Sequence, residues 1–350
     1  MVYLHFFIFI ISYIVDKKST IIDIASKTGY SIATVSRALN NMPIVHDRTK
    51  KKIWNIAKKM NYVPNIAAKN LVKGKSRLIG LVLPDDSQIY IDINFHIYQN
   101  TLKNNYRLIT YKSNNNHATQ SFNVEQMLQQ QIDGLIFSPI PGDYEVIERI
   151  HSFNLPMVII NRFIKNYPVN NIVIDLRQGV SEAVDYLKAA GIQRMIQLVR
   201  QDIIRGFERR NVFKFALKAN GLDYSDELTY EVDDSFKSGY QKIKEIITSG
   251  TPVDAVFCSS DISALGVVRG LLDCGKRVPE DISVVGCYNS ELSDYSNPRL
   301  SSIGADFAEL SMRAVSRLLH LIQTSGTEQN PEPVQNISVG TRFIPRESSR

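Results

Sequence analysis

The segment SIATVSRALNN, residues 31–41, carries small and hydroxyl side chains and a single arginine along one face of a potential helix. Val35, Ala38 and Leu39 share the other face at i, i+3, i+4 spacing and are expected to be buried. The first face lacks the Glu and Lys pairs of a solvated helix. A helix with short side chains at its first turn can enter the DNA major groove, although the pattern alone also fits a plain surface helix.

The side chains on this face suit three kinds of DNA contact. The hydroxyls of Ser31 and Ser36 can bind phosphate oxygens. Arg37 can donate two hydrogen bonds to O6 and N7 of a guanine. Ile32 and Ala33 can contact the methyl groups of thymines.

Three short helical patterns would position this face. Thr20 is a suitable N-cap for a first helix that ends at Gly29, Ser31 caps a second helix to about Asn40, and Asp47 begins a third. Two helices joined by a short turn containing Gly are typical of a helix-turn-helix. In the third helix the apolar residues at helical spacing are Ile53, Trp54, Ile56, Ala57 and Met60.

The charge distribution supports a polyanionic partner for this region. The whole chain of 350 residues has a formal net charge of +6. Residues 16–77 hold 14 Lys and Arg against 3 Asp, a net of +11, whereas the rest of the chain is mildly acidic. A basic head on an acidic body indicates that the head alone contacts nucleic acid.

Motifs for catalysis or metal binding are missing from the sequence. KGKS (73–76) is not a P-loop, because position 69 is Lys and the segment precedes the first strand. Neither G-x-G-x-x-G, H-E-x-x-H nor G-x-S-x-G occurs, and the six histidines are scattered. The three cysteines, which we expect to be buried, fit neither a zinc site nor a disulfide framework: Cys258, Cys274 and Cys287.

The first fifteen residues, MVYLHFFIFIISYIV, are almost wholly apolar. They are fewer than the ~20 residues that a membrane-spanning helix needs. They also lack the basic n-region and the cleavage site of a secretory signal. We expect translation to start near Val15 or Asp16, so that this segment does not belong to the fold. The alternative is a membrane anchor on a cytoplasmic body.

From Leu78 onward, buried strands alternate with amphipathic segments, which is typical of parallel sheets covered on both faces. Before them, residues 65–72 could form a helix too short to be stable alone. Residues 324–333 have the composition of a surface loop. The predicted strands are LIGLVLP (78–84), RLITY (107–111), DGLIFSP (133–139), PMVIIN (156–161), NIVID (171–175), RMIQLV (194–199), DAVFCSSD (254–261) and ISVVGC (282–287).

Residues 20–76 resemble the DNA-binding headpiece of the lactose/galactose repressor (LacI/GalR) family of bacterial transcription regulators. The matching text is TIIDIASKTGYSIATVSRALNN and TKKKIWNIAKKMNYVPNIAAKNL. The resemblance continues through IGLVLPD (79–85), DGLIF (133–137), PMVIINR (156–162), DISALG (261–266), VPEDISVVG (278–286) and PRES (345–348). It covers essentially everything after residue 18.

The resemblance implies an α/β protein with a small all-α helix-turn-helix headpiece and a two-lobed body with parallel sheets, similar to periplasmic sugar-binding proteins. The expected divisions are an extension outside the fold (1–18), the headpiece (19–63), a hinge helix and linker (64–76), and an effector-binding and dimerisation domain (77–350). Within that domain we expect an N-lobe at about 77–176 and 308–335, and a C-lobe at about 178–305 and 337–350.

The resemblance also implies roles for individual residues in DNA binding. Base contacts fall on Ile32, Ala33 and Arg37, and phosphate contacts on Ser31, Thr34, Ser36, Asn40 and Thr49. The hinge helix, which in the family folds on the operator, includes Asn65, Ala68 and Leu71. Leu71 would enter the minor groove as an apolar wedge that kinks the duplex.

Effector contacts implied by the resemblance fall in the cleft of the body. Arg209 matches the arginine that binds the effector in the family, with Val212 at a position where Gly is usual. Ser260 occupies a position where Asn is frequent. Tyr288 and Asn289 occupy a loop that commonly holds an aspartate, so the effector could be acidic, aromatic or phosphorylated. The predicted effector-binding residues are Arg209, Asp261, Tyr288, Asn289, Ser260 and Asp175.

These features together predict a cytoplasmic homodimeric repressor of a carbohydrate-utilisation operon, without a catalytic site, metal or cofactor. It would bind a pseudo-palindromic double-stranded operator. A sugar, sugar acid or sugar phosphate in the cleft would control it, and no membrane is expected as a partner. The alternatives are a membrane-tethered or solute-binding sensor of a carbohydrate-like ligand, and an enzyme on an α/β scaffold.

Overall fold

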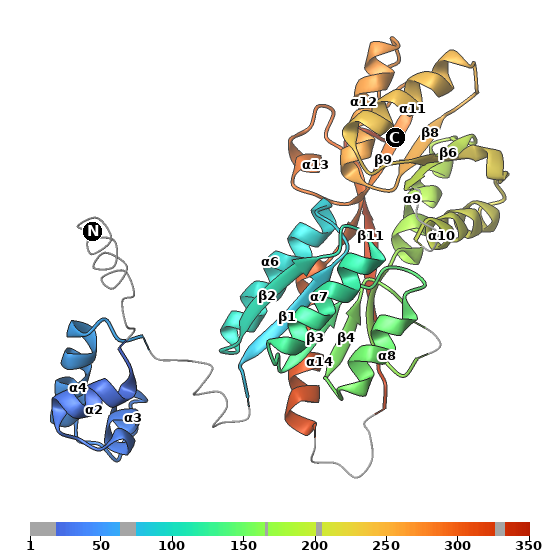
Figure 1. Ribbon diagram of the computed structural model, residues 1–350. Helices are drawn as coiled ribbons and strands as arrows, with labels where there is room; N and C mark the ends of the chain where they lie inside the picture. The colour runs from blue at the N-terminus through green and yellow to red at the C-terminus, as the bar shows by residue number, and fades with distance from the viewer. Residues whose placement is uncertain (1–18, 64–74, 165–166, 201–204, 326–332) are drawn as a thin grey trace, which may run out of the picture. The chain divides into compact units, whose positions relative to one another are not determined.

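A computed structural model describes residues 19–63, 75–164, 167–200, 205–325 and 333–350 (Figure 1). The chain divides into two compact units, Met1–Ser76 and Arg77–Arg350. The apolar segment 1–15, most of the loop 324–333, and the hinge residues Asn65, Ala68 and Leu71 lie outside the described residues.

The first unit contains three helices, α2 (Ile21–Thr28), α3 (Ile32–Leu39) and α4 (Asp47–Lys59). The predicted ends are confirmed: Thr20 forms a capping box with Asp23, and Gly29 ends α2 in the left-handed conformation at a φ of 74°. Ile24, Val35 and Ile53 meet in the core of this unit. Of the apolar residues noted at helical spacing in α4, Ile53 and Ala57 are buried, whereas Trp54 is 45% exposed.

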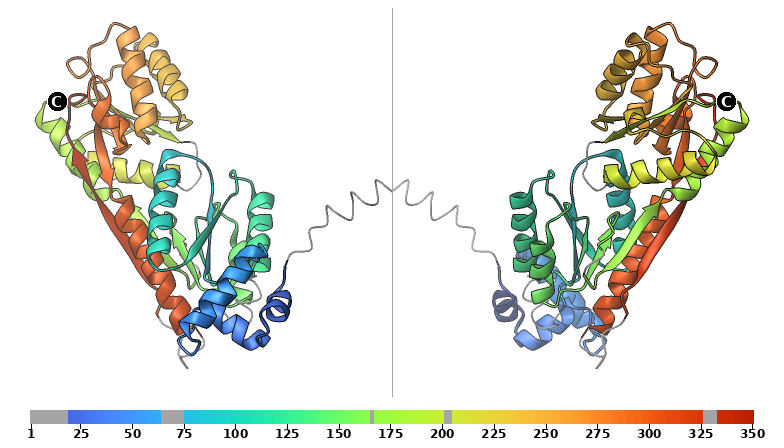
Figure 2. Two further views of the ribbon diagram at one scale, coloured as in Figure 1. Left: turned by 90° about the vertical axis from the view of Figure 1, so that its left-hand side faces the viewer. Right: turned by 90° about the vertical axis from the view of Figure 1, so that its right-hand side faces the viewer.

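The second unit is a body of two lobes, and the first lobe begins with alternating strands and helices. Its elements are β1 (Leu78–Leu83), α6 (Gln88–Lys103), β2 (Arg107–Lys112), α7 (His117–Gln129), β3 (Gly134–Phe137), α8 (Tyr144–Ser152), β4 (Met157–Ile160) and β5 (Asn170–Asp175). Helices α6 and α14 (Phe307–Thr324) cover one face of its sheet, and α7 and α8 cover the other (Figure 2).

The second lobe repeats this layering with α9 and α10 on one face and α11 and α12 on the other. Its elements are α9 (Arg177–Ala189), β6 (Met195–Arg200), α10 (Arg205–Ala219), the 3-10 helix η1 (Asp226–Leu228), β7 (Thr229–Val232), α11 (Phe236–Thr248), β8 (Ala255–Cys258), α12 (Asp261–Asp273), β9 (Ser283–Tyr288), α13 (Leu292–Tyr295) and β10 (Ser301–Ala305). The chain then returns to the first lobe in α14 (Phe307–Thr324) and ends with β11 (Asn336–Ile344).

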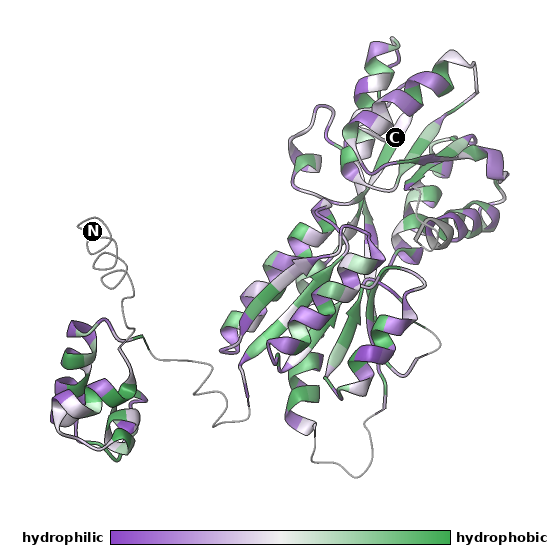
Figure 3. Ribbon diagram, in the orientation of Figure 1, coloured by the Kyte–Doolittle hydropathy of each residue, from purple (hydrophilic) through white to green (hydrophobic). Residues whose placement is uncertain are grey.

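The strands follow the order β2-β1-β3-β4-β5-β11-β10-β9-β8-β6-β7. Strand β11 belongs to both lobes, because residues 336–340 pair in parallel with β5 and residues 341–344 pair antiparallel with β10. All other pairings among the described strands are parallel, as predicted. The apolar strands lie between the helical layers in Figure 3.

Buried apolar runs identified most of the strands, and the exceptions have a physical cause. Strands β7, β10 and β11 were missed because their sequences, TYEV, SSIGA and NISVGTRFI, contain no continuous apolar run. The expected burial of the cysteines is confirmed for Cys258 and Cys287, whereas Cys274 is only half-buried, and all three are free.

Candidate DNA-binding and effector-binding sites

Helix α3 presents the face that the sequence predicted. Val35 and Ala38 are fully buried against α2 and α4. Ile32 is 49% exposed although it is a large apolar residue. Ala33 and Arg37 are also exposed. The three residues predicted to contact bases therefore lie on one accessible helix surface.

Most of the residues predicted to bind phosphate lie at the ends of this helix. Ser31 is its N-cap, and the Ser31 Oγ accepts a hydrogen bond from the Thr34 N–H at 3.2 Å. Asn40 is its C-cap, and its Nδ2 donates to the Ser36 carbonyl at 2.9 Å. Thr49 is half-buried in the first turn of α4. These contacts hold the side chains beside the exposed face of α3.

The body contains a pocket of about 810 Å³ at the junction of its lobes. Residues that follow β4 and residues of β5 and β11 form the wall in the first lobe. Residues of α9, α10 and the end of β9 form the wall in the second lobe. Three of the six residues predicted to bind effector line it, namely Asp175, Arg209 and Tyr288. Its apolar walls include Phe163, Val212 and Phe215.

Arg209 and Tyr288 are in direct contact within the pocket. The Arg209 Nη2 donates to the Tyr288 hydroxyl, and the guanidinium lies 5.4 Å from the centre of the Tyr288 ring. Burial acts to lower the pKa of Arg209, but the interactions with Tyr288 and Asp234 outweigh it and raise that pKa. Arg209 is therefore a buried, permanently charged donor group.

Tyr288 has an unusual backbone, with a φ of 89° at the end of β9. An aromatic residue with positive φ is strained, and such strain persists where the surroundings fix it. Here the centres of the Tyr288 and Phe307 rings lie 5.8 Å apart. Phe307 is the first residue of α14 in the other lobe. Tyr288 therefore contacts both lobes, through Arg209 in the second lobe and through Phe307 at the start of α14 in the first.

Asp175 lines the pocket as half of an ion pair. Both of its carboxylate oxygens accept hydrogen bonds from Arg177, including one of 2.9 Å from the Arg177 Nε. The hydrogen bonds with Arg177 lower the pKa of Asp175 despite its partial burial. Its charge is therefore balanced by a neighbour two residues along the chain.

The structure does not bring Ser260, Asp261 or Asn289 into this pocket. The Asp261 carboxylate is buried and accepts hydrogen bonds from the Ser302 hydroxyl at 2.6 Å and the Ser290 N–H at 2.5 Å. Ser260 caps α12. The Asn289 Oδ1 accepts from Arg346 at 2.7 Å. Asp261 and Asn289 thus stabilise the framework around β9 and β10, whereas Ser260 stabilises the start of α12.

Two pocket residues were missed by the sequence analysis. Asn161 and Arg162 follow β4, where Asn161 has a positive φ of 51° and Arg162 is 6% exposed. The Arg162 Nε donates to the Pro139 carbonyl at 3.3 Å. A signal was available, because polar residues directly after a buried parallel strand lie at the edge where ligands bind.

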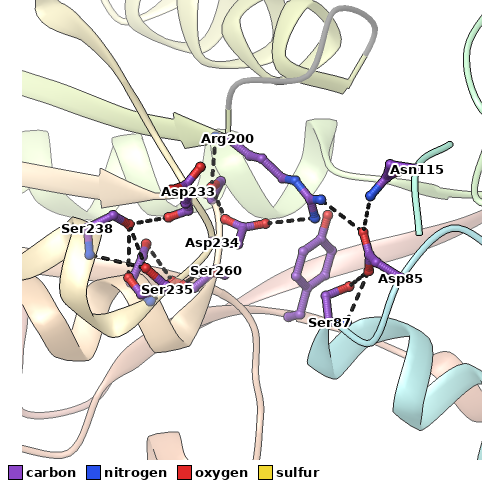
Figure 4. Close-up of polar contacts among 12 residues, drawn as sticks. Asp85, Ser87, Asn115, Arg200, Asp233, Asp234, Ser235, Ser238 and Ser260 are labelled. Atoms are coloured by element: carbon purple, nitrogen blue, oxygen red, sulfur yellow. Dashed lines mark hydrogen bonds and ion pairs between the residues drawn. The ribbon is translucent and has the colours of Figure 1, made fainter.

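A second polar cluster joins the lobes (Figure 4). Arg200, at the end of β6, donates to Asp85 of the first lobe at 2.9 Å and lies 3.9 Å from Asp234 of its own lobe. Asp85 also accepts hydrogen bonds from Ser87 and Asn115. No sequence motif indicated this contact.

No group of His, Cys, Asp or Glu residues in the described part of the chain has the arrangement of a metal site. None of the helices described is both long enough and apolar enough to cross a membrane.

Family models match both units of the chain. Residues 20–65 match the model for bacterial regulatory proteins of the lacI family, and residues 184–349 match the model for a periplasmic binding protein-like domain.

Curated relatives align over nearly the full length. The probable HTH-type transcriptional repressor ExuR of Bacillus subtilis (strain 168) is 32% identical over 338 residues, which cover 95% of this chain and 98% of the relative. Catabolite control protein A of Priestia megaterium is 28% identical, with 86% of this chain and 92% of the relative covered.

Solved structures agree with these relationships. The crystal structure of the Lac repressor dimer bound to operator and the anti-inducer ONPF superposes with a TM-score of 0.84 at 26% identity, over 95% of this chain and 99% of that one. The complex of the transcriptional regulator CelR with cellobiose has the same fold, with a TM-score of 0.69 at 24% identity and coverage of 95% and 100%. The chain belongs to the lacI family of bacterial regulatory proteins.

Proposed function

We propose that the protein is a sequence-specific repressor of a carbohydrate-utilisation operon, that it binds a pseudo-palindromic operator as a homodimer, and that a carbohydrate in the interlobe pocket controls it. The observation that carries this proposal is the exposed face of α3, where Ile32, Ala33 and Arg37 stand accessible on a folded helix-turn-helix. It would act in the cytoplasm by binding alone, without a catalytic step.

In this proposal the headpiece makes two sorts of contact with DNA. Ile32, Ala33 and Arg37 contact base edges in the major groove, and Leu71 of the hinge segment enters the minor groove beside Asn65 and Ala68. Phosphate contacts fix the register of the headpiece on the duplex without conferring sequence preference. The residues that make them are Ser31, Thr34, Ser36, Asn40 and Thr49.

A homodimer is supported by an apolar stripe on α6. Ile91, Phe95, Tyr98 and Leu102 are 50–56% exposed and recur at helical spacing on one side of the helix. Met312 of α14, which packs beside α6, is also exposed. A second copy of the chain would cover this stripe, in line with the Lac repressor dimer bound to operator.

The effector would act through the junction of the lobes. Arg209 and Tyr288 contribute to its pocket from the second lobe, and Asp175 ends β5 of the first. A ligand that binds one lobe arrangement more tightly than another shifts the population toward that arrangement. The two hinge segments of a dimer would then change spacing, which alters operator affinity.

Selection of bound duplexes from a random DNA pool by the full-length chain tests this function. We expect a pseudo-palindromic site with a preferred central step, and specific affinity that exceeds non-specific affinity by about 10³-fold or more. Binding that is weak, independent of sequence and strongly dependent on salt would contradict the proposal, since it would mean that the headpiece is merely basic.

A further inference from the structure

We propose that Arg200 is a switch between two lobe arrangements of the body. In the present structure its guanidinium pairs with Asp85 of the first lobe, and when the lobes separate it pairs with Asp234 of its own lobe. The switch is a property of the body alone, whereas its consequence for operator binding rests on the proposed function.

Arg200 lies between two carboxylates that belong to different lobes (Figure 4). Its Nη2 donates to the Asp85 Oδ2 at 2.9 Å, whereas its Nη1 lies 3.9 Å from the Asp234 Oδ2. The first contact is a hydrogen-bonded ion pair, and the second is an ion pair too long for a hydrogen bond. These three side chains are only 12–23% exposed, so water and salt screen their charges incompletely.

Each carboxylate is held in place by its own lobe. Ser87 donates to Asp85 from its hydroxyl at 2.6 Å and from its N–H at 3.0 Å. The Ser259 hydroxyl donates to the Asp234 Oδ1 at 2.6 Å and accepts from the Arg200 N–H at 3.1 Å. Arg200 and Asp234 are thus linked through Ser259 within the second lobe, wherever the first lobe lies.

The Arg200–Asp85 pair is far from the places where the chain crosses between the lobes. The chain crosses at residues 175–177, at 305–307 and within β11. In the strand order β1 is the fourth strand from β11 on one side, after β5, β4 and β3, and β6 is the fourth on the other side, after β10, β9 and β8. At about 4.8 Å per strand, the pair lies roughly 19 Å from β11.

This distance makes the pair sensitive to a small change in the angle between the lobes. A rotation of about 10° around β11 moves a point roughly 19 Å away by about 3 Å. Such a shift breaks the hydrogen bond with Asp85 but leaves Asp234 beside Arg200, because both belong to the second lobe. The Arg200 Nη1 then needs to approach Asp234 by about 1 Å to form a hydrogen bond.

The second acceptor makes the exchange reversible. A partly buried arginine that loses its partner is costly, so an interlobe pair with a single acceptor would resist opening. Asp234 provides the alternative partner, and Asp85 keeps the hydrogen bonds of Ser87 as the opening exposes it to water. Both arrangements therefore satisfy the guanidinium, which brings them close enough in free energy for a ligand to shift the population.

Strand β6 connects this switch to the pocket. Arg200 is the last residue of β6, and Arg209 lies on α10, the helix that follows this strand. Gln197 of β6 donates from its Nε2 to the Arg209 carbonyl at 3.4 Å. A ligand that contacts Arg209 and the first-lobe wall of the pocket therefore acts on the same lobe arrangement as Arg200.

Distances between two spin labels, one on each lobe, test the switch in the full-length chain. The labels are attached through Ala118→Cys and Lys237→Cys, at exposed positions in the first turns of α7 and α11. A Cys274→Ser background removes the half-buried cysteine, and Cys258 and Cys287 are buried. Labelled chain is mixed with an excess of unlabelled chain, so that pulsed spin resonance measures distances within one protomer.

The wild type should give mainly the short distance. Asp85→Asn should change the ratio of long to short distances by about tenfold toward the long one, because Arg200 then pairs with Asp234. Asp234→Asn alone should keep the short distance. Added to Asp85→Asn, it should return part of the population from the long distance, since the second partner is also lost.

Two neighbouring carboxylates provide matched controls. Asp86 pairs with Lys112 of its own lobe, and Asp233 is exposed. Asp86→Asn and Asp233→Asn should leave the distances unchanged. Unchanged distances in a folded Asp85→Asn protein overturn the switch, and so does a double variant that keeps all the long distances of Asp85→Asn. Thermal unfolding establishes that each variant is folded.

Operator affinity of the same variants keeps the switch apart from the proposed function. We expect Asp85→Asn to change the affinity for the selected operator and Asp234→Asn to reverse part of that change. If the distances respond but all variants bind the operator equally, the switch stands and its control of DNA binding fails. If the affinity changes while the distances do not, the switch fails and the repressor function stands.

Discussion

The Arg200 Nη2 and the Asp85 Oδ2 lie 2.9 Å apart, and this ion pair joins the two lobes of the body. Arg200 ends β6 and Asp85 follows β1, so the contact is made between the carboxyl ends of strands in different sheets. Ser87 and Asn115 orient the carboxylate by hydrogen bonds of 2.6 and 3.2 Å. The pair therefore stabilises the particular lobe arrangement in which the pocket has the geometry described above.

Asp85→Asn should destabilise the body by about 2 kcal/mol at neutral pH. Burial acts to raise the pKa of Asp85, but the hydrogen bonds with Ser87, the charge of Arg200 and the hydrogen bond with Asn115 lower it from 3.8 to about 2. A carboxyl group with a lowered pKa contributes stability above its unfolded pKa and loses it as the pH falls through the folded value.

Denaturant unfolding of both proteins across pH measures this effect. The difference in unfolding free energy should be constant above about pH 5 and shrink as the pH falls toward 2. Glu125→Gln, in the exposed pair with Arg149, is the control and should change stability much less. A difference that does not depend on pH would mean that the carboxylate charge of Asp85 is not responsible.

Phe95→Asp should separate the proposed dimer. It places a charge in the centre of the α6 stripe, where a second copy would desolvate it. Sedimentation at micromolar concentration should detect monomers, and operator affinity should fall by about 10²-fold or more because the two half-sites are no longer bound together. Phe122→Asp on α7 replaces a phenylalanine that is 63% exposed and should leave the dimer intact. A dimeric Phe95→Asp protein would place the interface elsewhere.

Local patterns allowed the headpiece and most strands to be predicted. The caps at Thr20 and Ser31 and the stop at Gly29 depend on neighbouring residues only, and the structure contains all three. The apolar strands are identifiable because both of their faces are buried. Helical spacing gives the apolar side of α4 but does not limit its width, so it does not tell the exposed Trp54 from the buried Ile53.

The pocket could be predicted only in part, because its residues come together through the tertiary fold. Arg209 and Tyr288 were found through the family resemblance. For Arg162 the only signal was its position directly after a buried strand. Arg200 and Asp85 come from separate strands, so no spacing within the sequence connects them. The resemblance also suggested Asp261, whose hydrogen bonds with Ser302 and Ser290 occupy it in the framework.

Arg37→Ala should weaken operator binding by about 1–3 kcal/mol and relax base preference at one symmetric position of each half-site. The reason is that an arginine on the exposed face of α3 can bind a guanine through two hydrogen bonds. Competition binding with operators mutated at each position gives the preference. Lys59→Ala, at the end of α4, removes a charge without altering that face and should preserve the preference. An equal loss on all sequences would reassign Arg37 to a phosphate contact.

Leu71→Ala should reduce both specific affinity and bending of the operator. An apolar side chain inserted between base pairs costs a few kcal/mol of unstacking, which is offset by the additional protein–DNA contact that the kink permits. Alanine is too short to hold the step open, so the duplex should straighten. Circular-permutation mobility or fluorescence transfer between operator ends measures the angle. Val72→Ala, a truncation at the adjacent position, is the matched control. If bending is unchanged in Leu71→Ala while affinity falls, Leu71 supports the hinge without acting as a wedge.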